Sequence, residues 1–347
     1  DSAAHINQCV PFLLLTVILL NCKLYVYSLL FKLKRHFYVY RLTTKYKKVI
    51  INFKIVCIRD KIMKYKIVVD SCCDLTADMK NWDDFEIVPL TLEIGDYRIF
   101  DDENFDQDDF IARMKANGGN AKSACPAPDA FKKAYEGDYE AVFVLTITNQ
   151  LSGTYNSALQ GKMLYEEEFN DDKKIVVFDS LATSGLETLV AKKIKELAES
   201  GKNTDDIQNE IESYIVNNTG LYFCLESLDA LKSNGRLFAL AAKVLEKIRV
   251  KLICKRTTQG NISLAAQDIT LNRAMMKMSN LIANELEGKD LSGETLVISY
   301  VCCEDRAKQV AAKICEKAKF GNVEILKASG LNSLYASDGG IIVSYSF

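Results

Sequence analysis

Hydroxyl, amide and glycine groups follow an apolar run near the middle of the chain. Residues 146–159 read TITNQLSGTYNSAL and come directly after the run from Ala141 to Leu145. Ser152, Gly153 and Thr154 precede a stretch that reads as a helix, and free N–H groups at a helix start favour an anion. The pattern predicts a site for a carboxylate or a phosphate. An ordinary helix N-cap at Ser152 or Asn149 explains the same residues equally well.

Several common catalytic arrangements are missing. Residues 64–347 contain no histidine, because His5 and His36 both lie before them. A Ser-His-Asp or Cys-His site therefore cannot form in that part of the chain. The chain also lacks the G-x-x-x-x-G-K-[ST] and G-x-G-x-x-G loops and any Cys-x-x-Cys spacing. A Ser-Lys pair stays open, and we predict neither a cofactor nor a bound metal.

The elements that must position these residues alternate along the chain. Strands are predicted at 66–69, 86–94, 141–146 and 175–178. Helices are predicted at 106–116, 129–135 and 187–199, and another helix follows LSGTYNSAL and continues through Tyr165. SACPAP, residues 123–128, is expected to be a loop because prolines disrupt a helix interior. The alternation predicts a parallel sheet with ligands at its carboxyl edge. That edge carries Asp70, Ser71, Thr148, Asn149, Ser152, Asp179 and Ser180.

The second part of the chain alternates less regularly. A helix capped by Thr204 is predicted from Ile207, Ile211 and Ile215, which repeat at four-residue spacing. Further strands are predicted at 221–225, 250–255, 262–267, 296–301 and 323–327, and helices near 228–234, 239–248, 272–287 and 305–318. We therefore predict an α/β first domain at 64–215 and an α+β second domain at 216–347.

Residues 1–62 have a different composition from the rest. They hold 11 of the 44 basic residues and two acidic ones, a net charge of +9 (11 − 2), which leaves −11 (33 − 44) for residues 63–347. Residues 10–31 are apolar enough to suggest a membrane span, but Asn21 and Lys23 lie near the middle. We expect an extension outside the native fold, with Met63 as the natural start. A membrane tether through residues 10–31 is the alternative.

Six segments occur in a fixed order from about residue 64 to the C-terminus. They are DSCCDL (70–75), VPLTLEIGDYRIFDD (88–102), SACPAP (123–128), LSGTYNSA (151–158), VVFDSLATSG (176–185) and LDALKSNGR (228–236). Together they resemble the DegV family, bacterial fatty-acid-binding proteins that include the FakB partners of fatty acid kinase. The resemblance implies two α/β domains that enclose one long-chain fatty acid, with its carboxylate held by hydroxyl groups.

The resemblance also implies the site residues. Ser123 stands at a carboxylate-binding Thr of the family's Thr-Ser-Gln-Pro loop, whereas Ala124 and Cys125 depart from that loop. Thr148 and Asn149 stand where family members often have two serines. We expect the carboxylate to be held by Ser123, Asn149, Ser152, Gly153 and Thr154. Pocket or sheet-edge positions are expected for Asp70, Ser71, Asp179, Ser180, Ser337 and Asp338.

Two further positions bear on a kinase partner. Gly235 and Arg236 match a family pair whose arginine faces the kinase, although an arginine at a helix C-terminus is also explained by the helix dipole. The family's C-terminal histidine is missing, since Ser337 stands at about its place and Asp338 follows. Without an imidazole donor, the resemblance implies fatty-acid binding more firmly than coupling to a kinase.

We therefore predict a cytoplasmic, non-catalytic fatty-acid carrier that contacts membranes at most transiently and has a fatty acid kinase as a further partner. Nucleic acid is not an expected partner, because residues 63–347 carry a charge of −11 and show no basic stripe. The alternative is an enzyme for a small carboxylate or phosphate, with Asp70 and Asp179 as acid and base or as metal ligands.

Overall fold

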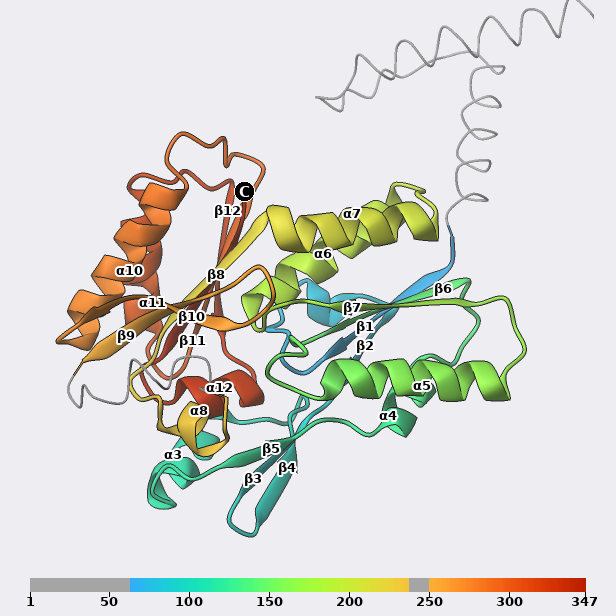
Figure 1. Ribbon diagram of the computed structural model, residues 1–347, viewed down its shortest axis with the longest axis horizontal. Coiled ribbons are helices and arrows are strands. Elements are labelled where there is room, and N and C mark those ends of the chain that lie inside the picture. The colour runs from blue at the N-terminus through green and yellow to red at the C-terminus, as the bar shows by residue number, and fades with distance from the viewer. Residues whose placement is uncertain (1–62, 237–249) are drawn as a thin grey trace, which may run out of the picture. The chain divides into compact units, whose positions relative to one another are not determined.

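Figure 1 shows the computed structural model, which describes residues 63–236 and 250–347. These residues form three sheets and the helices that cover them. The extension at 1–62 and the helix predicted at 239–248 lie outside the described residues. The predicted division into two domains near residue 215 remains a prediction. Within the described ranges, no helix has both the length and the apolar character that a membrane crossing requires.

The first sheet is parallel, as predicted. Its strands are β1 (Tyr65–Asp70), β2 (Phe85–Val88), β6 (Ala141–Thr146) and β7 (Lys174–Asp179), in the order β2-β1-β6-β7. Strand β6 is buried along its whole length, which is typical of a parallel strand covered on both faces. All four strands end at one edge, where the polar loops predicted from the sequence begin.

Helices cover both faces of the parallel sheet. They are α4 (Pro128–Ala134), α5 (Thr154–Glu168), α6 (Gly185–Glu199) and α7 (Thr204–Asn217). Val68 and Val142 pack with Phe131 of α4 and Tyr165 of α5 on one face. Alternate residues of the same strands pack with α6 on the opposite face. Asn203, rather than the predicted Thr204, caps α7, because its side chain accepts a hydrogen bond from Asp206 N at 2.8 Å.

The second sheet has six strands of mixed direction. They are β8 (Thr219–Cys224), β9 (Lys251–Arg256), β10 (Ile262–Asp268), β11 (Thr295–Tyr300), β12 (Asn322–Lys327) and β13 (Ile341–Ser346), in the order β10-β9-β8-β13-β11-β12. Only β11 and β12 run parallel within it. Helices α10 (Leu271–Glu285) and α11 (Glu304–Cys315) cover one face. Helix α6 contacts the other face, which we call the inner face.

A third, antiparallel sheet corrects two expectations. Its strands are β3 (Thr91–Ile94), β4 (Tyr97–Phe100) and β5 (Lys122–Ala124), in the order β4-β3-β5. The strand predicted at 86–94 is in fact β2 and β3 in two different sheets, because Pro89 between them has no N–H for a strand ladder. Ser123 lies in β5 and not in a loop, and it pairs with Leu92 of β3.

The remaining described elements are short or lie between the sheets. They are η1 (Met79–Asn81), α3 (Gln107–Ala116), α8 (Asp229–Ser233) and α12 (Gly330–Ala336). Helix α3 starts as predicted, since the Asp106 side chain accepts hydrogen bonds from Asp108 N and Asp109 N. Neither α12 nor β13 was predicted, and both prove to line the candidate site.

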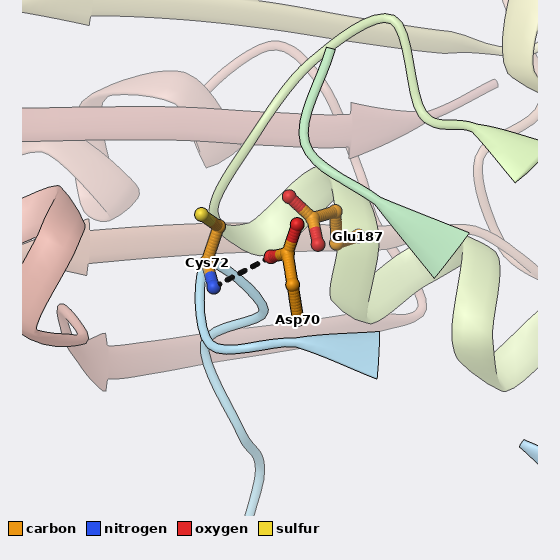
Figure 2. A group of neighbouring side chains, drawn as sticks. All are labelled: Asp70, Cys72 and Glu187. Carbon is orange, nitrogen blue, oxygen red and sulfur yellow. Dashed lines mark hydrogen bonds between the residues drawn. The ribbon is translucent and has the colours of Figure 1, made fainter. Parts of the chain in front are cut away.

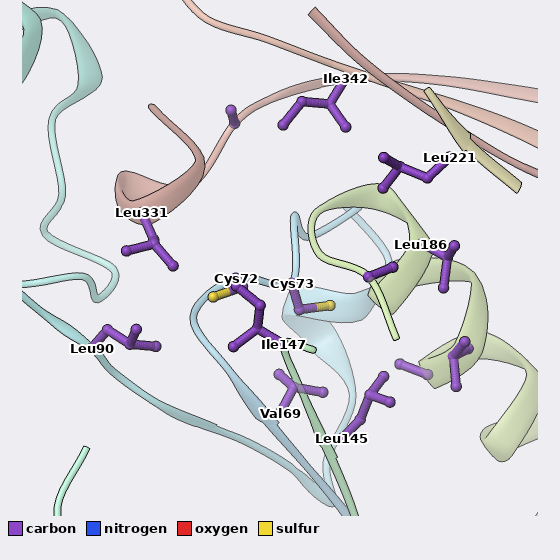
Figure 3. Packing of buried hydrophobic residues seen from close by; sticks show 14 of the residues in the cluster. Val69, Cys72, Cys73, Leu90, Leu145, Ile147, Leu186, Leu221, Leu331 and Ile342 are labelled. Carbon is purple, nitrogen blue, oxygen red and sulfur yellow. The ribbon is translucent and has the colours of Figure 1, made fainter. Parts of the chain in front are cut away.

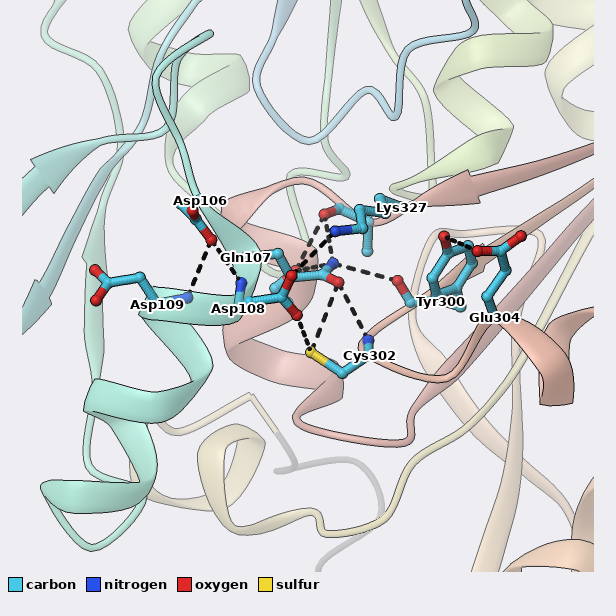
Figure 4. A network of polar contacts seen from close by, with 10 residues as sticks. Asp106, Gln107, Asp108, Asp109, Tyr300, Cys302, Glu304 and Lys327 are labelled. Carbon is cyan, nitrogen blue, oxygen red and sulfur yellow. Dashed lines mark hydrogen bonds and ion pairs between the residues drawn. The ribbon is translucent and has the colours of Figure 1, made fainter.

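Gln107 at the start of α3 fastens this helix to the six-stranded sheet (Figure 4). Its buried amide nitrogen donates to Ala328 O and Ser333 Oγ, both at 3.0 Å, and its amide oxygen accepts from Cys302 N at 3.1 Å. The exposed Asp108 beside it pairs with Lys327 at 3.2 Å. Satisfied buried amides of this kind hold two elements in one arrangement.

Apolar side chains from distant segments converge between the sheets (Figure 3). Val69 and Leu145 come from the parallel sheet, and Leu221 and Ile342 come from the six-stranded sheet. Leu331 of α12 joins the same cluster. This shared core places the carboxyl edge of the parallel sheet opposite the inner face of the six-stranded sheet.

Candidate functional site

A cavity of about 300 Å³ lies between that edge and the inner face. Leu221 and Phe223 of β8 and Leu225 directly after it line one wall. Ile342 of β13 and Leu331 of α12 add further apolar surface. The volume lies at the lower end of the range of small-molecule sites, and such sites are largely apolar with a few placed polar groups.

The polar part of the wall consists mainly of uncharged donors and acceptors. It contains Ser123, Thr148, Ser152, Thr183, Asn332 and Tyr335. Two arginines, Arg236 and Arg256, also line the cavity, whereas the described lining residues include no carboxylate. An anion in this cavity therefore meets hydroxyl donors and positive charge.

Ser123 faces a residue that the sequence did not single out. Its Oγ lies 3.2 Å from the phenol oxygen of Tyr335, and both residues line the cavity. Ser123 comes from β5 and Tyr335 from α12, so two separate elements meet at this pair. The two hydroxyls can turn their protons toward a shared acceptor.

Ser152 forms the turn that starts α5. Its Oγ lies 2.8 Å from Thr154 Oγ1 and accepts a hydrogen bond from Thr154 N at 3.3 Å. Gly153 occupies the N-cap position, so neither Ser152 nor Asn149 is the N-cap. Ser152 and Gly153 line the cavity, while Thr154 is fully buried behind them. Thr154 thus orients Ser152.

Thr148 and Asn149 have different places. Thr148 lines the cavity, and its Oγ1 donates to Gly260 O at 3.2 Å in the β9–β10 turn. Asn149 is exposed and is not among the lining residues, and its side-chain oxygen accepts from Gln150 Nε2 at 2.6 Å. Of these two, the structure brings Thr148 to the wall.

The predicted sheet-edge residues mainly hold the loops. Asp179 accepts from Leu181 N at 2.8 Å and from Asn149 N at 3.3 Å. Ser71 Oγ accepts from Leu90 N at 3.1 Å, and Ser180 Oγ exchanges hydrogen bonds with the backbone of Ala182. The loop ends that carry Leu90, Leu181 and Ala182 to the cavity wall are fixed in this way.

Asp70 is buried beside Glu187 and Cys72 (Figure 2). Its two oxygens accept from Cys72 N and Ile147 N, each at 2.8 Å. Burial and the nearby Asp70 raise the pKa of Glu187 well above its usual value, which favours the protonated form of this carboxyl. Both side-chain oxygens of Glu187 are buried without a hydrogen-bond partner among the described residues, and a protonated carboxyl at this place can donate to the neighbouring Asp70. Asp179 accepts from a different pair of backbone groups, Leu181 N and Asn149 N.

Two buried carboxylates that were not predicted as site residues hold α12 in place. Asp101 accepts from Gly330 N at 2.7 Å and from Leu331 N at 2.8 Å. Asp74 accepts from Ser329 N at 2.7 Å. Because free N–H groups at a helix start favour negative charge, these contacts fix the helix that carries Tyr335.

Ser337 and Asp338 lie outside the cavity lining. Ser337 follows α12 with a φ of 57°, where the chain turns toward β13. Asp338 forms an exposed ion pair with Lys115 at 2.5 Å. Its carboxylate is therefore engaged with a cation on α3 and does not line the cavity.

Arg236 lines the cavity next to the Ser152 turn. Its Nε donates to Leu151 O at 3.1 Å, and a second donor contacts Asn234 O. The backbone N–H of Arg236 also closes α8 through Leu231 O at 2.7 Å. This position fits a cation near a helix C-terminus, and the contact with a kinase that the resemblance implies remains a prediction.

Comparison with known proteins agrees with this architecture. A family model described as "Uncharacterised protein, DegV family" matches residues 64–346. A DegV domain-containing protein of Streptococcus pneumoniae is 33% identical over 286 residues, 82% of this chain and 99% of that protein. A DegV domain-containing protein of Streptococcus gordonii is 33% identical over 285 residues, with the same coverage of both chains.

Solved structures share the fold. A DegV family protein of Ruminococcus gnavus, refined with vaccenic acid, has a TM-score of 0.77 and 36% identity over 82% of this chain and all of that chain. The Fatty Acid Kinase (Fak) B3 protein of Streptococcus pneumoniae, loaded with linoleic acid, has a TM-score of 0.72 and 32% identity over 82% and 99% of the two chains. From residue 64 to residue 346, this chain belongs to the DegV family.

Proposed function

We propose that this protein binds one long-chain fatty acid in the cavity, with the carboxylate at the hydroxyl groups and the tail along the inner face. The observation that carries the proposal is the wall itself. Leucine, isoleucine and phenylalanine side chains form one part, and Ser123, Ser152 and Tyr335 form another. Relatives of 32–36% identity with the same fold hold vaccenic or linoleic acid, which supports this choice of ligand.

The ligand's two ends contribute differently. Burying ~14 methylenes at roughly 0.8 kcal/mol each provides ~11 kcal/mol before the ordering cost of binding. The carboxylate must keep its hydrogen bonds when it leaves water, because an unpaired buried charge is expensive. Hydroxyl donors and the nearby Arg236 meet that need. The tail therefore provides affinity, and the polar wall fixes the orientation.

The binding proposal is tested by mass spectrometry of protein purified from bacteria under denaturing conditions. We expect a fatty acid to be released in about equal amount to the protein. Delipidated protein should then bind an added fatty acid and bind its methyl ester more weakly. A protein that carries no lipid and does not bind either ligand contradicts the proposal. A melting-temperature increase with divalent cations in such a protein would instead favour a small-molecule enzyme.

We further infer that the protein presents the bound carboxylate to a fatty acid kinase and is not itself the catalyst. Similarity to the Streptococcus pneumoniae Fatty Acid Kinase (Fak) B3 protein supports this step. The position of Arg236, which lines the cavity and follows α8 in the chain, also supports it. Incubation with a kinase subunit and ATP, followed by hydroxylamine trapping of an acyl phosphate, is the test. We expect trapped product from the wild type and much less from Arg236→Ala.

A further inference from the structure

The turn between β9 and β10 forms part of the cavity wall. Gly260 and Asn261 of this turn line the cavity, as does Ile262 at the start of β10. Asn261 is partly buried and was not predicted as a site residue. Within the described part of the chain, its side-chain amide has no hydrogen-bond partner, although its backbone N–H and carbonyl are both engaged. The wall therefore contains an amide whose donors are free.

This turn lies against the polar part of the wall. Gly260 O accepts a hydrogen bond from Thr148 Oγ1 at 3.2 Å, which engages the only proton of that hydroxyl. Thr148 O in turn accepts from Ser152 N at 3.2 Å, so Thr148 and Ser152 belong to one turn. The close approach requires a glycine, because the φ of Gly260 is +79° and a Cβ there would lie 2.3 Å from Thr148 Oγ1. Asn261 is thus one residue away from a contact with the Ser152 turn.

Hydrogen bonds within the β9–β10 turn fix its shape. Thr257 Oγ1 accepts from Gln259 N at 3.3 Å and from Asn261 N at 3.1 Å. Thr257 N donates to Asn261 O at 2.8 Å, and Thr257 O accepts from Gly260 N at 3.0 Å. A residue whose backbone is held in this way loses little further freedom when its side chain binds a ligand. The backbone of Asn261 is therefore fixed by the turn itself.

Two other polar residues of the wall have their donors engaged within the protein. Thr183 Oγ1 donates to Asn332 Oδ1 at 2.8 Å. Asn332 Nδ2 donates to Cys72 O at 2.8 Å and to Asp74 Oδ1 at 3.0 Å. A carboxylate has about four acceptor positions, and it is stable away from water only when donors meet them. The side-chain amide of Asn261 can supply two N–H donors.

We propose that Asn261 is a carboxylate-binding residue, which donates its side-chain N–H groups to the head group of the fatty acid. This inference rests on the proposed fatty-acid binding, and it adds a donor from the six-stranded sheet. In the proposed complex, Ser123 reaches the same head group from the three-stranded sheet, and Ser152 reaches it from the turn that starts α5. The carboxylate consequently joins the β9–β10 turn to both of these segments.

The test compares a fatty acid with its methyl ester on delipidated full-length protein at about pH 8, where carboxyl groups with ordinary pKa values are ionised. Asn261→Ala should weaken binding of the acid about 10-fold, the effect of one hydrogen bond to a charged group. Asn261→Asp should weaken it about 100-fold, because the new carboxylate also repels that of the ligand. Binding of the methyl ester should change much less in both variants, since the ester carries no charge.

Gln259→Glu is the matched control for Asn261→Asp. Gln259 is exposed in the same turn and does not line the cavity, and the substitution adds the same charge. Its affinity for both ligands should equal that of the wild type, because an exposed charge is screened by solvent.

The acid and ester titrations separate the possible failures. Equal losses of acid and ester affinity in Asn261→Asp overturn the proposal, as does unchanged acid affinity in either folded variant of Asn261. If Asn261→Asp does not fold, Asn261→Ala decides by the same comparison of acid with ester. A wild type that binds no fatty acid instead overturns the proposed function.

Discussion

The hydroxyl oxygens of Ser123 and Tyr335 lie 3.2 Å apart at the cavity wall, although 212 positions separate these residues in the sequence. Ser123 is carried by the three-stranded sheet and Tyr335 by α12. Two donors at this spacing can bind one carboxylate oxygen each, or share one. In the proposed complex, Tyr335 supplies a donor near the position where the sequence lacks the family's histidine.

The first prediction concerns Tyr335→Phe. The ring stays in place and only the hydroxyl is lost, so we expect fatty-acid binding to weaken about 10- to 100-fold, the effect of one hydrogen bond to a charged group. Binding of the methyl ester should change much less. Isothermal titration of both ligands measures the difference.

Tyr139→Phe is the matched control for that variant. Tyr139 also loses a single hydrogen bond, to Asp84 at 3.1 Å, and packs with the cluster on the far face of the parallel sheet. Its affinity for fatty acid should equal that of the wild type. An equal loss of fatty-acid affinity in Tyr335→Phe and Tyr139→Phe would show that the Tyr335 hydroxyl does not contact the ligand.

The second prediction concerns pH and Asp101. Burial raises the pKa of Asp101 from 3.8 to about 7. The folded state therefore binds the Asp101 proton more tightly than the unfolded state, and this stabilisation is present below pH 4 and lost as the pH rises through 7. The shift corresponds to roughly 4 kcal/mol across that range.

Denaturant unfolding from pH 4 to pH 8 checks this prediction. Asp101→Asn cannot ionise, so its free energy of unfolding should decrease less with rising pH than that of the wild type. The variant also provides only one acceptor for Gly330 N and Leu331 N, which adds a loss that does not depend on pH. If the free energy of unfolding changes with pH in the same way in both proteins, Asp101 is not the source of the pH dependence.

The third prediction concerns the buried pair of Glu187 and Asp70. Because burial favours the protonated form of Glu187, Glu187→Gln keeps its shape and a donor toward Asp70, and we expect its unfolding free energy at pH 7 to lie within about 1 kcal/mol of the wild type. Glu187→Ala leaves a cavity and should lose about 2 to 5 kcal/mol. Chemical denaturation of both variants gives the comparison.

The same variants test a metal at this place. Ligand atoms of Asp70, Cys72 and Glu187 all lie within 4.8 Å of one another. If the pair shares a proton, Mg²⁺ or Zn²⁺ should not raise the melting temperature of the wild type. An increase in the wild type that is absent from Glu187→Gln would contradict the shared proton and favour metal binding.

The fourth prediction concerns Gly260 in the β9–β10 turn. Its φ is +79°, and a Cβ there would lie 2.3 Å from Thr148 Oγ1 and 3.1 Å from Leu181 Cα. Gly260→Ala should therefore displace the cavity wall as well as strain the backbone. Gly201→Ala is the control, since its φ is +80° and nothing lies within 4 Å of its added Cβ.

We expect the free energy of unfolding of both glycine variants to fall by about 1 kcal/mol, because alanine is strained at a positive φ. Only Gly260→Ala should also weaken fatty-acid binding. Thermal unfolding and ligand titration on the two proteins separate these effects. Unchanged ligand affinity in a folded Gly260→Ala protein would show that the turn does not support the site.

The sequence predicts the parallel sheet well because the relevant signals are local. Apolar runs such as 141–146 end in polar loops and are followed by helices, and this order is what a parallel sheet requires. Ser152 and Gly153 could be placed at the site for the same reason. The single strand predicted at 86–94 was wrong because its apolar pattern continues across Pro89, where the chain passes from one sheet to another.

The other wall could not be predicted because its causes are distant in the chain. Helix α12 spans only Gly330–Ala336, and it is held by Asp74 and Asp101 more than 200 residues earlier. Without that helix, nothing in the sequence connects Tyr335 to Ser123. Arg256 shows no local signal either, because its contacts come from α7 and from the start of β8.

The most direct measurement is an NMR titration of a fatty acid labelled with ¹³C at the carboxyl carbon. We expect one bound resonance that stays in its ionised position to a lower pH than the free acid, because hydroxyl donors and Arg236 favour the charged form. Ser123→Ala and Tyr335→Phe should each shift that resonance. A bound carboxyl carbon that titrates like the free acid, and that neither substitution moves, would contradict a carboxylate held at this wall.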